Sequence, residues 1–218
     1  MHIPKTAGTA LKNAFITNGA QPFTILSTHD EQIKHGDNWI IVIRDPWKRF
    51  CSAYWERRTN PLRRKINDTA PREFQRGGYQ DLTSAEQQLF IDCATPDELL
   101  SKIRFNMPWW GDFLKKHYNM FQLFRPLIWY LGNVHQFEKQ QHRVHMAINQ
   151  QDLNDVMQNH FDIEMPTQPF LARTRKQFDI PQSYDISPGN REYFTKELYS
   201  EDYELIEYIK QQPYYTTK

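Results

Sequence analysis

The stretch WIIVIRDPWKRFCSAY, residues 39–54, decides the fold class of this 218-residue chain. Its first five residues are all apolar, which is typical of a strand buried on both faces within a parallel sheet. The dipeptide Asp45-Pro46 then ends the strand, and proline suits the first turn of a helix. We therefore predict a strand over residues 39–43 and a helix from Pro46 to about Arg58, which together indicate an α/β fold.

The residues before this stretch extend the same pattern. Residues 9–18 have apolar positions at helical spacing and are followed by Gly19, so they predict a helix. Residues 23–26, Phe-Thr-Ile-Leu, predict a short strand. The apolar positions of the predicted helix are Ala10, Leu11, Ala14 and Phe15.

The remainder of the chain is predicted to be mainly helical. Residues 60–81 are polar and basic, contain Pro and paired Gly, and predict an exposed, mobile loop. One further strand is predicted over residues 134–137. The predicted helices cover residues 84–94, 96–105, 109–118, 152–161 and 195–211.

Charge is distributed unevenly along the chain. The formal net charge of +1 argues against a general nucleic-acid-binding role. Residues 44–76 nevertheless hold ten Lys and Arg against four acids, whereas residues 185–207 hold seven acids against two basic residues. The basic section is therefore the one expected to meet an anion, such as an acidic acceptor.

Cysteine content and hydropathy bear on the compartment. Cys51 and Cys93 show no metal-binding spacing and predict free thiols in an intracellular protein. No run approaches the roughly 20 apolar residues of a membrane span, and no signal peptide is recognisable. We expect a cytoplasmic or otherwise soluble protein, with a removed membrane anchor as the alternative.

A first anion-binding candidate is the sequence HIPKTAGTAL, residues 2–11. Small residues allow successive backbone N–H groups to close on a phosphate or sulfate, and the N-terminus of a following helix favours the anion. Lys5 adds a point charge. The lysine precedes the small residues, so this is not a Walker A loop. The alternative is a surface turn ahead of a helix.

A second candidate is the pair Arg44 and Ser52. Arg44 follows the predicted buried strand, at the edge where α/β folds bind ligands. Ser52 lies eight residues later, about two helical turns on. A guanidinium and a hydroxyl in this arrangement can hold one phosphate. The alternative is an exposed arginine and a helix-surface serine.

Together, HIPKTAGT and VIRDPWKRFCSAY resemble the PAPS-dependent sulfotransferase superfamily (PAPS is 3′-phosphoadenosine 5′-phosphosulfate). These two motifs are most similar in sequence to those of Golgi-type carbohydrate sulfotransferases, including the uronyl 2-O-sulfotransferases. The resemblance is looser over residues 124–131, 136–138 and 197–205, and residues 57–112 match nothing in it. It implies one domain over residues 1–218, with a P-loop-like central parallel sheet flanked by helices, a cofactor-binding core at residues 1–58 and a helical C-terminal elaboration.

The resemblance also implies roles for individual residues. Arg44 and Ser52 would bind the 3′-phosphate of PAPS. Arg173, in a Pro-flanked basic loop, would contact the nucleotide, although a solvated loop is the alternative. The 5′-phosphosulfate would be bound by Lys5, Thr6, Ala7, Gly8, Thr9 and Ala10. Ala10 stands where the family often has Ser or Thr, and the strand before the loop is reduced to Met1-His2-Ile3.

Sulfuryl transfer needs a base for the acceptor hydroxyl and positive charge on the leaving oxygen. Lys5 would meet that charge, and no metal is required. The resemblance implies a histidine base between the second strand and Arg44, which matches His29. The imidazole pKa of about 6.5 suits this role. His35 and Glu56 are the competing candidates.

Two other groups of residues are candidate ligand sites. His142 and His145 could reach one metal from a helix, but no third ligand stands nearby in the sequence, so no metal site is predicted. Trp109 and Trp110 could stack on adenine or a sugar, or pack in the interior.

The predicted function is transfer of a sulfuryl group from PAPS to a hydroxyl acceptor, with a carbohydrate expected and 3′,5′-ADP as the product. Two alternatives stay open. One is a non-catalytic protein of the same fold that binds nucleotides or polyanions. The other is an ATP-dependent phosphotransferase, which would need a lysine after its glycines and carboxylates for Mg²⁺.

Overall fold

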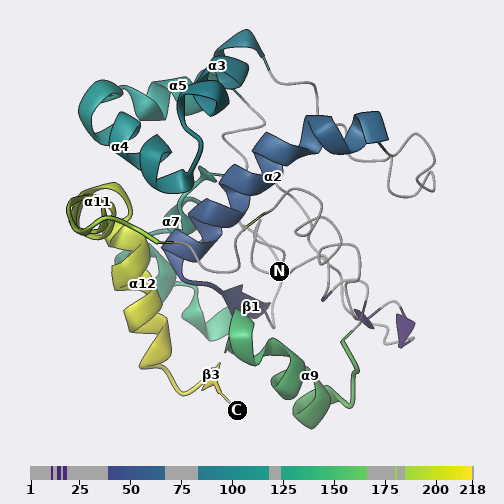
Figure 1. Ribbon diagram of the computed structural model, residues 1–218. Coiled ribbons are helices and arrows are strands. Elements are labelled where there is room, and N and C mark those ends of the chain that lie inside the picture. The colour runs from purple at the N-terminus through teal and green to yellow at the C-terminus, as the bar shows by residue number, and fades with distance from the viewer. Residues whose placement is uncertain are drawn as a thin grey trace.

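A computed structural model gives the fold of this chain. It describes Leu11, Ala14, Phe15, Thr17, Asn18, residues 39–66, 83–117, 124–165, Ile180 and residues 185–217. Over residues 60–66 the description covers the backbone alone. Figure 1 shows a small sheet with helices packed on it and a group of helices above it.

The sheet has three parallel strands in the order β1-β2-β3, so the predicted parallel sheet is confirmed. The strands are β1 (Trp39–Ile43), β2 (Val144–Asn149) and β3 (Tyr215–Thr216). All five residues of β1 are buried, as its apolar run predicted. Neither β2 nor β3 was predicted from the sequence.

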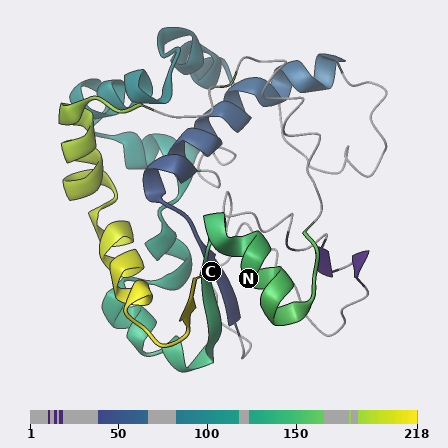
Figure 2. The same cartoon turned by 60° about the horizontal axis from the view of Figure 1, so that its bottom comes forward.

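Helices cover both faces of the sheet, which gives an α/β arrangement of three layers (Figure 2). Side chains of a strand alternate between faces, so Trp39, Ile41 and Ile43 point to one side of β1 and Ile40 and Val42 to the other. The first side packs against α7 (Leu127–Leu131), α8 (Val134–Glu138) and α12 (Ser200–Lys210).

The second side packs against α9 (Leu153–Phe161), whose buried Leu153, Val156 and Met157 confirm the predicted amphipathic helix. A further apolar group joins them there: Leu11, Ala14 and Phe15, which are buried and have helical backbone. These described residues agree with the helix predicted over residues 9–18.

The pairing of β1 with β2 shifts register between Trp39 and Ile40, which pair with Val144 and Met146. His145 lies at this irregularity and is exposed. Two short 3₁₀ helices, η2 (Gln141–Arg143) and η3 (Gln150–Asp152), flank β2.

The strand predicted over residues 134–137 is wrong, because these residues form α8. Asn133 accepts a hydrogen bond from the Gln136 backbone at 3.0 Å, and the Gln136 side chain accepts one from the Asn133 backbone at 3.1 Å. This reciprocal capping box stabilises the start of a helix, and it outweighs the strand propensity of Val134 and Phe137.

A group of helices packs on the far side of α2 from the sheet. It contains α3 (Ser84–Asp92), α4 (Pro96–Asn106) and α5 (Trp110–Lys116), close to the predicted bounds. Helix α2 runs from Pro46 to Ile66, so it passes the predicted end at Arg58. The first seven residues of the predicted loop over 60–81 are therefore helical, because Leu, Arg and Lys favour a helix and Pro61 does not stop it.

The C-terminal helix predicted over residues 195–211 is split. These residues form a π-helical turn η4 (Phe194–Leu198) and α12, and a separate short helix α11 (Pro188–Tyr193) precedes them. The Tyr199 backbone N–H donates to the Phe194 carbonyl at 2.9 Å, and the two rings stack with centroids 4.5 Å apart. This aromatic contact accompanies the wider turn.

Of the described helices, none is long and apolar enough to cross a membrane.

Candidate functional site

The predicted Arg44–Ser52 pair lies where β1 passes into α2. Ile43, the last residue of β1, pairs with Asn149, the last residue of β2, so the carboxyl ends of the two strands lie side by side. Arg44 follows directly, as the sequence predicted. The Asp45 carboxylate then accepts a hydrogen bond from the Lys48 backbone at 2.8 Å and caps the N-terminus of α2. The turn that carries Arg44 is therefore held by a local cap.

Arg44 and Ser52 are both half-buried. Burial raises the pKa of the neighbouring Cys51 thiol strongly, and the positive charge of Arg44 is the main influence that opposes this increase. The Arg44 charge therefore acts at the second turn of α2, where Ser52 follows Cys51. The structure brings the two predicted phosphate ligands to the same end of one helix.

Glu56, one of the competing bases, is half-buried on α2 one turn beyond Ser52. The remaining predicted site residues lie outside the described residues. They are Lys5, Thr6, Ala7, Gly8, Thr9, Ala10, His29, His35 and Arg173. The roles given to them from the sequence therefore stay predictions.

A buried ion pair that sequence reasoning missed joins this site to the C-terminal helix. Arg49, on the first turn of α2, is 3% exposed, and its Nη2 lies 3.7 Å from Oδ2 of Asp202, which is 1% exposed. Arg49 also donates to the carbonyl of Arg125. Asp202 accepts two further hydrogen bonds, from the backbone of Leu127 at 2.6 Å and of Ile128 at 2.9 Å.

Burial raises the pKa of Asp202, while Arg49 and the two backbone N–H groups oppose the increase. A buried carboxylate is tolerated when a cation and hydrogen bonds compensate for the lost hydration, and all of these are present here. The sequence carried only a weak signal for this pair. Arg49 is a basic residue in the first turn of a predicted helix, and its burial is visible only in the structure.

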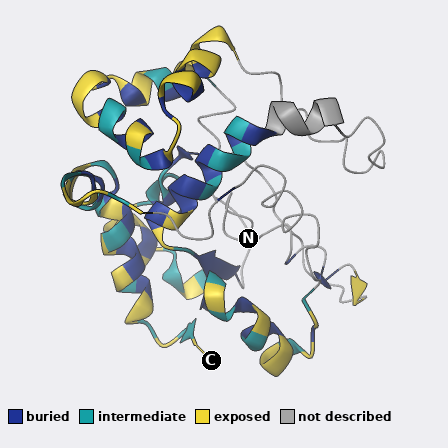
Figure 3. Cartoon of the chain, viewed as in Figure 1, coloured by how far each residue is buried: buried dark blue, intermediate teal, exposed yellow. Residues whose placement is uncertain are grey.

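Aromatic rings surround the same turns of α2, a stretch of the helix coloured largely as buried in Figure 3. The ring centroid of Phe50 lies 5.0 Å from that of Phe124 and 5.5 Å from that of Phe194. The ring centroids of Trp47 and Phe194 are 5.3 Å apart. The Tyr199 hydroxyl donates a hydrogen bond to the Phe124 carbonyl at 2.6 Å. The C-terminal helices are thus packed directly against the segment that carries Arg44 and Ser52.

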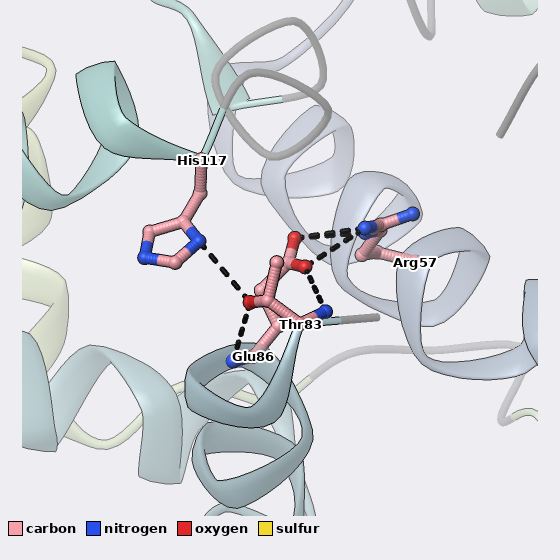
Figure 4. Close-up of polar contacts among 4 residues, drawn as sticks. All are labelled: Arg57, Thr83, Glu86 and His117. Carbon is pink, nitrogen blue, oxygen red and sulfur yellow. Dashed lines mark hydrogen bonds and ion pairs between the residues drawn. The ribbon is translucent and has the colours of Figure 1, made fainter. Parts of the chain in front are cut away.

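A second polar cluster, drawn in Figure 4, lies farther along α2. Oε1 of Glu86 accepts from Nε of Arg57 at 3.1 Å and from Nη2 at 2.9 Å, and both residues are 1% exposed. Glu86 also forms a capping box with Thr83, whose hydroxyl lies 3.2 Å from Nδ1 of His117. These contacts account for the cluster as a structural link between α2, α3 and α5.

The other residues singled out from the sequence have structural roles or lie apart. His142 is in η2 and His145 is on β2, so they do not share a helix. Within the described ranges, no group of three or more His, Cys, Asp and Glu could hold a metal ion. Trp110 is buried and stacks on Phe113, whereas Trp109 is exposed. Both cysteines are buried free thiols, as predicted.

Comparisons with known proteins found no match: none among models of protein families, none among curated proteins and none among solved structures.

Proposed function

We propose that this protein is a sulfotransferase that moves a sulfuryl group from PAPS to a hydroxyl group of a carbohydrate. The observation that carries the proposal is the position of Arg44. It follows the buried parallel strand β1, and its charge acts at the second turn of α2, beside Ser52. A guanidinium and a hydroxyl so arranged can hold a phosphate bidentately. Leu11, Ala14 and Phe15 pack on the same sheet and directly follow the predicted loop at residues 5–10.

Each group has one task in the proposed reaction. PAPS supplies the activated sulfuryl group. Arg44 and Ser52 hold its 3′-phosphate, and Lys5 with the backbone of residues 6–9 stabilises the negative charge on the 5′-phosphate side. His29 accepts the acceptor's proton as the new O–S bond forms and the S–O bond to the 5′-phosphate breaks. The products are a sulfate ester and 3′,5′-ADP.

Calorimetric titration with 3′,5′-ADP and with 5′-ADP tests the 3′-phosphate site. We expect 3′,5′-ADP to bind more tightly than 5′-ADP. The variant Arg44→Gln should remove about 1.5–3 kcal/mol of that preference, the usual worth of a hydrogen bond to a charged group. This corresponds to roughly a 10- to 100-fold weaker affinity. Lys115→Gln, which alters an exposed cation of α5, is the control and should bind as the wild type does. Equal weak binding of both nucleotides would refute the assignment.

The base is tested with His29→Ala in a radiolabelled sulfate-transfer assay on a panel of glycans. Turnover should fall about 10²- to 10⁴-fold, the usual contribution of general base catalysis, with 3′,5′-ADP affinity nearly unchanged. Turnover equal to that of the wild type would exclude His29. A parallel assay with radiolabelled ATP in place of PAPS, with and without EDTA, tests the rival phosphotransferase, which needs Mg²⁺. Phosphate transfer that is lost in EDTA and restored by Mg²⁺ would favour that rival.

A further inference from the structure

Asp202 lies on α12, yet its carboxylate is at the meeting point of three elements. It faces Arg49 of α2 across 3.7 Å and accepts the backbone N–H groups of Leu127 and Ile128 at the start of α7. Since both charges are almost fully buried, neither can find water as a substitute partner. The position of Arg49 therefore depends on Asp202, together with the Arg125 carbonyl to which it donates.

Arg49 belongs to the segment that carries the phosphate ligands. Its backbone N–H donates to the Asp45 carbonyl at 3.0 Å, the first helical hydrogen bond of α2. Ser52 follows three residues later, on the next turn and on a neighbouring row of the helix. A shift of Arg49 would therefore move the Asp45 corner and the Ser52 hydroxyl relative to Arg44.

A second residue of α12 reaches the same turn. The pKa of the Tyr203 phenol is raised by burial and then by the negative charge of Asp45, and a hydrogen bond from the Trp47 backbone opposes the increase. Consecutive residues of α12 therefore contact the first turn of α2. Phe194 of η4 also packs its ring against those of Trp47 and Phe50 in α2.

We propose that Asp202 is a positioning residue: through Arg49 it holds the first turns of α2 so that Arg44 and Ser52 keep the separation that one phosphate requires. The inference rests on the proposed function for the identity of the anion. Its physical basis is that a bidentate site tolerates errors of only about 0.5 Å, so the shell that supports it affects affinity. The C-terminal helices then form part of the binding site although they supply no ligand.

The test compares Asp202→Asn with Glu86→Gln. Both change one carboxylate of a buried pair with an arginine of α2, but Glu86 pairs with Arg57, beyond the phosphate ligands. Both variants should unfold at lower temperature. We expect Asp202→Asn alone to lose about tenfold of its preference for 3′,5′-ADP over 5′-ADP in calorimetry below the unfolding temperature. Arg49→Lys keeps the positive charge but lacks the planar guanidinium with its several N–H donors. It should lose the same preference for 3′,5′-ADP, and it replaces Asp202→Asn in the test if that variant does not fold.

Two results would overturn the proposal. One is an unchanged nucleotide preference in both Asp202→Asn and Arg49→Lys. The other is an equal loss in Glu86→Gln, which would mean that general destabilisation is the cause. A wild-type protein with no preference for 3′,5′-ADP would instead refute the proposed function. Amide hydrogen exchange then decides the positioning role: Asp202→Asn should speed exchange over residues 46–52, Glu86→Gln should not, and equal exchange would refute it.

Discussion

The buried pair of Arg57 and Glu86 allows the sharpest prediction about stability. Nε and Nη2 of Arg57 donate to Glu86 at 2.9–3.1 Å, and both side chains are almost fully enclosed. Removing one partner of such a pair leaves a buried charge without compensation, which costs about 3–5 kcal/mol. Glu86 also accepts the Thr83 backbone N–H at 2.8 Å, and a glutamine at this position keeps an acceptor for that cap contact.

We therefore expect Glu86→Gln and Arg57→Met each to lose at least about 3 kcal/mol of unfolding free energy. For a chain of this size, that is a drop of about 10 °C in unfolding temperature. The double variant Arg57→Met/Glu86→Gln should lose less than the sum of the two single losses, because it buries no uncompensated charge. Urea denaturation followed by tryptophan fluorescence measures all three.

The double-mutant cycle carries the refutation. If the loss in the double variant equals the sum of the single losses, the two side chains are not coupled and the electrostatic reasoning is wrong. Glu192→Gln is the matched control, because its pair with Lys196 is exposed to solvent. Its urea midpoint should equal that of the wild type.

Three further predictions concern residues elsewhere in the fold. Burial raises the pKa of Tyr54 from 10.0 to about 12, so the unfolded chain loses this proton at a lower pH than the folded chain does. The free energy of unfolding should therefore fall between pH 10 and 12. In alkaline denaturation, Tyr54→Phe should reduce that fall. Gly132 has φ of 80°, and an added Cβ would lie 2.6 Å from Cβ of Gln136, so Gly132→Ala should cost about 1–3 kcal/mol in urea. Phe194→Ala should cost about 3–5 kcal/mol, whereas Phe105→Ala, at an exposed position, should leave the urea midpoint unchanged. A flat profile, a neutral glycine substitution or equal effects of the two phenylalanines would contradict the respective argument.

Elements with strong local signals were predicted well. The five apolar residues of β1 and the proline at the start of α2 gave the strand, the corner and the helix. Thr95 and Pro96 begin α4 where capping chemistry requires, and the Thr95 hydroxyl accepts from the Glu98 backbone at 3.2 Å. Arg44 follows the carboxyl end of β1, where the sequence placed it.

The errors arose where local signals compete or are weak. In residues 134–137 the strand propensity of Val134 and Phe137 competed with a capping box, and the helix formed. Strand β2 contains an exposed His145 at a register shift, which breaks the apolar run that a buried strand normally shows. Strand β3 has two residues, and it pairs with the edge of β2 after α12 ends. Two residues are too few to show the alternation that predicts a strand from sequence.

The sequence by itself determined the α/β character around residues 39–58 and the position of Arg44 relative to a buried strand, because hydrophobic periodicity, proline and capping act over a few residues. Only the tertiary structure decided which carboxylate would neutralise Arg49. Several acids of the C-terminal section are equivalent in sequence, but Asp202 alone among the described acids of α12 is buried. Burial removes hydration, and the cost of a charge without water makes the choice of partner a property of the packed chain.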